Sequence, residues 1–135
     1  MKRYVTDTQC LLWYLADDRR LPRPANRAFR SADDGTAQIL VPSIALVEAI
    51  FLAQRKRVSD ALLKRVLDLR EDPDVSITVV ALDMAVVRAV NDFGSAAVPE
   101  LADRVIAATA RALGLPLLTV DHEIAESGLV DVVGS

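Results

Sequence analysis

A chain of 135 residues is long enough to enclose a hydrophobic core and too short to divide comfortably into two, so we predict one domain over residues 1–135. Hydrophobic residues make up 52% of the chain and aromatic residues 4%, which excludes a disordered chain and predicts a core of Ala, Val, Leu and Ile. The net charge of -3 does not by itself indicate a protein that binds nucleic acid.

No membrane-spanning segment is expected. The most apolar stretch, residues 39–53, contains Pro42 and Glu48 and is too short to cross a bilayer. The N-terminus resembles a signal peptide in charge and hydropathy, but Asp7 interrupts the pattern, so we interpret it as a first strand and helix. The single cysteine, Cys10, cannot form an intramolecular disulfide, which agrees with a reducing cytoplasm as the location.

In chain order, the first half of the sequence predicts a strand, two helices, a second strand and two further helices. These are a strand at residues 2–6, a helix from Thr8 or Gln9 to about Leu15, a helix from Pro24 to Phe29, a strand at 39–41, a helix that begins at Pro42-Ser43 with Ser43 as its cap, and an amphipathic helix at 59–70.

The second half continues the alternation. It predicts a strand at residues 75–82, a helix capped by Asp83, a loop at 94–99, an alanine-rich helix at 100–113 that ends at Gly114, a strand at 117–120, a helical turn at 123–127 and a short strand at 129–133. Short apolar strands that alternate with helices indicate a parallel sheet with both faces covered. We therefore predict an α/β fold, a three-layer α/β/α sandwich with a mostly parallel central sheet of about five strands.

Two acidic residues directly follow apolar runs that are predicted strands. Asp7 closes the run RYVTD, and Asp121 closes the run LLTVD. In an open parallel sheet, ligands bind just beyond the carboxyl ends of the strands. We therefore expect Asp7 and Asp121 to point into the same crevice.

Two further acids interrupt the apolar faces of predicted helices. Glu48 lies four residues after Ile44 and three before Phe51. Asp103 lies three residues before Ile106. Residues at these offsets share one helix face, so we expect both carboxylates to face inward. A carboxylate on a buried face is unfavourable unless it is paired or binds a metal.

Together the four acids predict one divalent-cation site. Oxygen-only ligation suits Mg²⁺ or Mn²⁺, whereas zinc prefers His or Cys. Such a metal can activate water for attack on a phosphodiester. The hydroxyls of Thr8, Ser43 and Thr119 lie beside the acids in sequence and are expected to orient ligands or water. Taken singly, each acid also has a structural explanation as a helix cap or turn residue, and Glu48 is the hardest to explain in that way.

Charge is distributed unevenly along the chain. Residues 1–70 hold 13 basic and 8 acidic side chains, and residues 71–135 hold 3 basic and 11 acidic side chains. This asymmetry suits a polyanion held beside an acidic metal site. Ordinary solvated helix faces explain the charges equally well, and both interpretations stay open.

Four other side chains invite a functional interpretation. Trp13 and Tyr14 have the chemistry to stack on RNA bases, but packing in the core or in a dimer is favoured. Arg104 and Arg111 are seven residues apart on one helix face. We expect these two arginines to be solvated or to contact a partner.

The acidic residues lie in four segments that resemble the PIN-domain family, specifically the VapC-type toxins of bacterial toxin–antitoxin pairs. The segments are YVTDT at residues 4–8, VPSIALVE at 41–48, VPELADRVIAATA at 98–110 and GLPLLTVD at 114–121. They extend over essentially the whole chain in the family's order and spacing, and the third segment is the most specific.

The resemblance implies a Mg²⁺- or Mn²⁺-dependent endoribonuclease that hydrolyses RNA with metal-activated water, leaving a 3′-hydroxyl and a 5′-phosphate. Asp7, Glu48, Asp103 and Asp121 match the family's acidic quartet. Asp7 and Asp103 would be the firmest metal contacts, with Glu48 and Asp121 completing the site directly or through water. The resemblance also implies a homodimer and a cognate antitoxin whose tail covers the active site. The alternative is a catalytically silent PIN-like module that binds RNA or the antitoxin, and the complete quartet argues against it.

Overall fold

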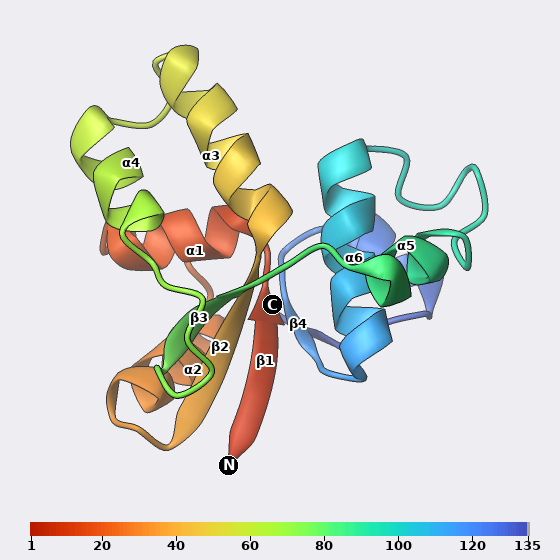
Figure 1. The fold of residues 1–135 in the computed structure, drawn as a ribbon, viewed down its shortest axis with the longest axis horizontal. Helices are drawn as coiled ribbons and strands as arrows, with labels where there is room; N and C mark the ends of the chain where they lie inside the picture. The colour runs from red at the N-terminus through yellow and green to blue at the C-terminus, as the bar shows by residue number, and fades with distance from the viewer. Residues whose placement is uncertain (135) are drawn as a thin grey trace.

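The computed structural model describes residues 1–134 and contains a five-stranded parallel sheet at its centre (Figure 1). The strands are β1 (Lys2–Thr6), β2 (Ala37–Pro42), β3 (Ile77–Val80), β4 (Leu117–Leu118) and β5 (Val132–Val133). Their order in the sheet is β3-β2-β1-β4-β5, and every adjacent pair is parallel.

Seven helices within the described residues complete the fold. They are α1 (Thr8–Leu15), α2 (Arg23–Asp33), α3 (Ser43–Gln54), α4 (Asp60–Leu67), α5 (Met84–Val90), α6 (Leu101–Leu113) and α7 (His122–Ser127). The predicted α/β/α arrangement around a sheet of about five strands is confirmed, and the sheet is parallel throughout. No helix within residues 1–134 is both long and apolar enough to cross a membrane.

The central position of β1 follows from its pairing on both sides. Val5 is in register with Leu40 of β2 and with Leu117 of β4, and all three side chains are buried. Strands covered on both faces consist of continuous apolar residues, as in Ile39, Leu40 and Val41 of β2.

The alanine-rich helix α6 packs closely against β1 because its inner face is built from small residues. Ala107, Ala108 and Ala110 are fully buried, together with Ile106. On its other sides α6 contacts α5 and α3. The start of α6 is therefore held near the end of β1, where the first candidate acid lies.

Two predicted helix ends are confirmed: Asp83 accepts a hydrogen bond from the Val86 amide, and Gly114 ends α6 in the left-handed conformation with φ 66°. Ser59, which was expected as the first residue of its helix, is instead its N-cap and accepts a hydrogen bond from the Leu62 amide. Ser43 is not a cap. It is the first residue of α3, and the cap position is taken by Pro42 at the end of β2 without a side-chain hydrogen bond.

Several elements are shorter than predicted. The strand expected at 75–82 covers only Ile77–Val80, and the strands expected at 117–120 and 129–133 are reduced to two residues each. The helix expected at 59–70 ends at Leu67, and Arg70 instead forms an isolated parallel bridge with Thr78. The apolar residues outside the ladders differ in environment: Leu129 and Val130 before β5 pack against the core, whereas Ala81 and Leu82 after β3 are exposed.

Candidate active site

The order of strands in the sheet reverses between β1 and β4. From β1 the chain passes to β2 and β3 on one side, and it later returns to β4 and β5 on the other side. Such a reversal of strand order is where open α/β sheets bind ligands. Asp7 follows β1 directly, and Thr119 and Asp121 follow β4. Figure 1 shows the end of β1 between α3 on one side and α6 on the other.

Asp7 is the most buried of the four acids, with 7% of the residue exposed. It is the N-cap of α1, where its Oδ1 accepts a hydrogen bond of 2.8 Å from the Cys10 amide. Its Oδ2 accepts a hydrogen bond of 2.6 Å from the hydroxyl of Thr119. Burial raises the pKa of Asp7, and the bonds from Thr119 and Cys10 oppose that rise.

Thr119 connects two of the acids. Its hydroxyl donates to Asp7 and accepts a hydrogen bond of 3.1 Å from the Asp121 amide. Thr119 is itself 1% exposed, so both bonds are shielded from water. The predicted contact between this hydroxyl and the acids is therefore present in the structure.

Glu48 reaches the same region from α3. Its side chain is half-buried and accepts a hydrogen bond from the hydroxyl of Thr8, the first residue of α1. Thr8 thus contacts an acid, as expected for a residue that orients a ligand. Ser43, by contrast, makes no hydrogen bond to any of the four acids within residues 1–134.

The prediction that Glu48 and Phe51 share one buried face of their helix is wrong for Phe51. Phe51, which was expected on the same buried face, is 56% exposed, and the buried positions of α3 are Ala45 and Ala49. The helix is apolar on nearly all sides and forms with α4 a hairpin that extends past the sheet (Figure 1). Glu48 therefore lies at the edge of the buried face and not within it.

Asp103 approaches from the first turn of α6. Its pKa is raised to about 7, first by burial and then by the negative charges of Asp121, Glu48 and Asp7, with a further contribution from a hydrogen bond to Asp121. The four predicted acids are therefore close enough to influence one another's ionisation. Within residues 1–134, however, no three His, Cys, Asp or Glu side chains converge as a ready-made metal site.

The donor chemistry of this group fits a hard divalent cation. All four side chains offer carboxylate oxygens, which Mg²⁺ and Mn²⁺ prefer. The nearby sulfur of Cys10 is buried, and the raised pKa of its thiol keeps it protonated, so it is not a suitable thiolate ligand for zinc. No ion pair within residues 1–134 involves any of the four acids. Their mutual repulsion is thus uncompensated by the protein's own cations.

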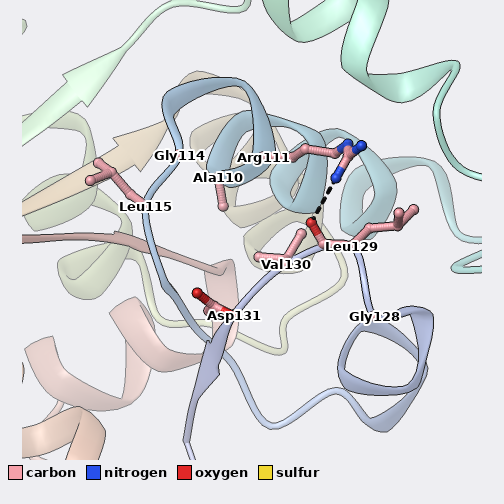
Figure 2. Close-up of a pocket in the computed structure, with 8 residues that line it drawn as sticks. All are labelled: Ala110, Arg111, Gly114, Leu115, Gly128, Leu129, Val130 and Asp131. Carbon is pink, nitrogen blue, oxygen red and sulfur yellow. Dashed lines mark hydrogen bonds between the residues drawn. The ribbon is translucent and has the colours of Figure 1, made fainter.

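Two of the cavities in the structure differ in their position relative to the four acids. The cavity in Figure 2, of about 270 Å³, lies at the C-terminal end of α6 and contains none of the four acids. A second cavity, of about 440 Å³, borders Glu48 and is mostly apolar. Its walls include three exposed hydrophobic side chains, Val47, Phe51 and Leu101, and one cation, Arg55.

The raised pKa of Asp103 predicts how stability depends on pH. The folded protein holds the proton on the Asp103 carboxyl more tightly than the unfolded chain does. The contribution of this proton to the free energy of unfolding is therefore complete below the unfolded pKa of 3.8 and is lost as pH rises through about 7. In EDTA, we expect the melting temperature to fall between about pH 4 and pH 7, and to fall less steeply in Asp103→Asn. Thermal unfolding followed by circular dichroism measures both slopes. Equal slopes in the two proteins would contradict the assignment of this pH dependence to Asp103.

A family model described as the PIN domain matches residues 4–128. The chain belongs to the PIN-domain family. This membership agrees with the fold described above.

Solved structures agree with this assignment. The fold is similar to VapBC2 from Rickettsia felis bound to a promoter DNA fragment, with a TM-score of 0.71 and 13% identity over 98% of this chain and 99% of that chain. It is similar to DNA-bound VapBC from Salmonella typhimurium, with a TM-score of 0.70 and 17% identity over 98% of each chain. It is also similar to VapC20 from Mycobacterium tuberculosis, described as a toxin that cleaves the sarcin-ricin loop, with a TM-score of 0.68 and 17% identity over 98% of this chain and 99% of that chain. No curated protein matches the sequence at a significant level.

Proposed function

We propose that this protein is a metal-dependent endoribonuclease and the toxin component of a toxin–antitoxin pair. One observation carries the proposal: no ion pair within residues 1–134 involves Asp7, Glu48, Asp103 or Asp121, and burial together with the charges of the other three acids raises the pKa of Asp103 to about 7. The mutual repulsion of these carboxylates is unfavourable, and a divalent cation would relieve it.

In this proposal, Asp7 and Asp103 hold Mg²⁺ or Mn²⁺, and Glu48 and Asp121 complete the site directly or through water. Bound metal supplies an activated water for attack on the phosphodiester and positive charge for the phosphoryl oxygens. Thr119 fixes the orientation of the Asp7 carboxylate through its 2.6 Å hydrogen bond, and Thr8 does the same for Glu48. Hydrolysis by this route leaves a 3′-hydroxyl and a 5′-phosphate.

RNA is the proposed substrate, and two observations support it. The structurally similar VapC20 is described as a toxin that cleaves the sarcin-ricin loop. The basic side chains of this chain are concentrated in residues 1–70, which include Arg55 beside the cavity that borders Glu48. A cation that lines the same cavity as Glu48 is suited to contact a phosphate of the RNA backbone.

A cognate antitoxin is the proposed partner, and a cytoplasmic homodimer is the proposed state of the toxin. Similar structures include complexes described as VapBC and as FitAB. In this chain, the exposed apolar residues Val47, Phe51 and Leu101 lie beside Glu48, where a partner that covers the acids would bury them.

The Asp7–Thr119 hydrogen bond yields a test of the metal site that does not require RNA. We expect Thr119→Val to weaken Mn²⁺ binding by about 10- to 100-fold, because the Asp7 carboxylate loses the donor that orients it. Thr119→Ser keeps the hydroxyl and should bind Mn²⁺ nearly as the unchanged protein does. Isothermal titration calorimetry measures the three affinities. Equal affinities for the Val and Ser variants would contradict a role for this hydroxyl.

Cleavage of total cellular RNA tests the proposed function directly. The antitoxin-free protein is incubated with RNA in Mg²⁺, Mn²⁺ or EDTA, and the fragment ends are sequenced. We expect discrete, metal-dependent fragments with 5′-phosphates. Absence of cleavage under all conditions would favour the catalytically silent binding module.

A further inference from the structure

The loop between α5 and α6 ends in an unusual backbone conformation. Val98 has φ 50°, in the left-handed region, although it is β-branched and 1% exposed. β-branched residues rarely occupy this region, so the surrounding contacts must hold it there. Figure 1 shows this loop as a long excursion that leads from α5 into the first turn of α6.

The side chain that holds this loop is Arg104. Its Nε donates a hydrogen bond of 3.0 Å to the carbonyl oxygen of Val98. Its Nη2 donates to the carbonyl oxygens of Ala97, Gly94 and Ser95 at 2.7, 3.0 and 3.4 Å. The expectation that Arg104 is solvated or contacts a partner is therefore wrong. A planar guanidinium can serve several carbonyls at once, which a lysine ammonium does less well.

Helix α6 begins without a side-chain hydrogen bond from its N-cap residue. Its N-cap, Glu100, makes no side-chain capping hydrogen bond, and Leu101 is 73% exposed. The hydrogen bonds of Arg104 to the loop take over this role. Asp103 is the adjacent residue, so any movement of the first turn moves its carboxylate relative to Asp7, Glu48 and Asp121.

We propose that Arg104 is a positioning residue for Asp103, which keeps that carboxylate against the other three acids by fastening the loop at Val98 to the first turn of α6. The inference rests on the proposed metal-binding role of the four acids. It assigns to Arg104 no contact with substrate or metal.

Arg111 provides a matched control on the same helix. Its Nη1 donates a hydrogen bond of 3.1 Å to the carbonyl oxygen of Leu129, as Figure 2 shows. Its Nε donates a hydrogen bond of 2.9 Å to the carboxylate of Asp92. Arg111 thus fastens neighbouring segments to the opposite end of α6. Loss of either arginine removes loop contacts, but only Arg104 adjoins a candidate metal ligand.

The test compares Mn²⁺ binding by Arg104→Met, Arg104→Lys and Arg111→Met with that of the unchanged protein, using the electron paramagnetic resonance signal of free Mn²⁺. We expect about tenfold weaker binding in Arg104→Met and a smaller loss in Arg104→Lys, by analogy with outer residues that orient metal ligands. Arg111→Met should retain the original affinity. Hydrogen exchange should also become faster at residues 95–103 in Arg104→Met alone.

The outcomes separate the inference from the function on which it rests. If the unchanged protein binds no Mn²⁺, the proposed function fails and the inference fails with it. If the unchanged protein binds Mn²⁺ and Arg104→Met binds it as tightly as Arg111→Met, only the inference is overturned. If Arg104→Met does not fold, Arg104→Lys decides, and an unchanged affinity in that folded variant overturns the inference.

Discussion

Replacement of Asp7 by asparagine is expected to abolish metal-dependent RNA cleavage, by about 10³-fold or more, while the fold is retained. Asparagine has nearly the shape of aspartate, and its carbonyl oxygen can accept the 2.8 Å hydrogen bond from the Cys10 amide that caps α1. It carries no charge, so it cannot neutralise a divalent cation. Because burial raises the pKa of Asp7, removal of this charge should leave thermal stability in EDTA unchanged or slightly higher.

Asp83→Asn is the matched control for this variant. Asp83 is also an N-cap aspartate, and it accepts a 3.0 Å hydrogen bond from the Val86 amide at the start of α5. It is exposed and is not one of the four acids. We expect Asp83→Asn to cleave RNA normally in the assay with Mg²⁺, Mn²⁺ or EDTA. Cleavage that survives in Asp7→Asn and in EDTA would contradict the metal site and would indicate a contaminating ribonuclease.

Phe29→Ala is expected to cause the largest loss of stability, about 3–5 kcal/mol in the free energy of unfolding. Phe29 is 0% exposed and stacks on Tyr14 with ring centroids 4.5 Å apart. Truncation would leave a cavity between α2 and α1, and α1 is the helix that Asp7 caps. Urea denaturation measures the loss.

Phe29→Leu is the control for this substitution, because it keeps most of the apolar volume and should cost about 1.5 kcal/mol or less. Cleavage per folded molecule should not change in the leucine variant. A loss below about 1 kcal/mol in Phe29→Ala would contradict the packing described for α1 and α2.

The same packing decides the role of Tyr14. Its ring is stacked on Phe29, and its hydroxyl donates to the carboxylate of Asp33. Burial and this bond raise the pKa of Tyr14 to about 12. Tyr14 thus makes its contacts within the protein. This agrees with the interpretation favoured from the sequence, which was packing and not stacking on RNA bases. Trp13 lies under the Arg20 guanidinium, 5.4 Å from the ring centroid, and also packs against the core.

Local pattern was sufficient for the order of elements and for most of their ends. Apolar runs of β-branched residues predicted strands, and Asp83 and Gly114 marked helix ends through backbone chemistry that involves only neighbouring residues. Local pattern was less successful at strand ends, because apolar residues also occur in buried turns and in exposed turns. The lengths of β3, β4 and β5 were overestimated for this reason, and Ala81 and Leu82, which follow β3, are exposed.

The sequence by itself determined the α/β alternation and singled out Asp7, Glu48, Asp103 and Asp121, because charge in an apolar context is visible without coordinates. Only the tertiary structure decided that β1 lies between β2 and β4, and that Thr119, 112 residues away in sequence, donates to Asp7. It also decided that α3 exposes Phe51, since a helix that is apolar on nearly all sides carries no local signal of its inward face. Helical and strand periodicities describe neighbours along the chain, whereas these contacts depend on the order in which strands pack.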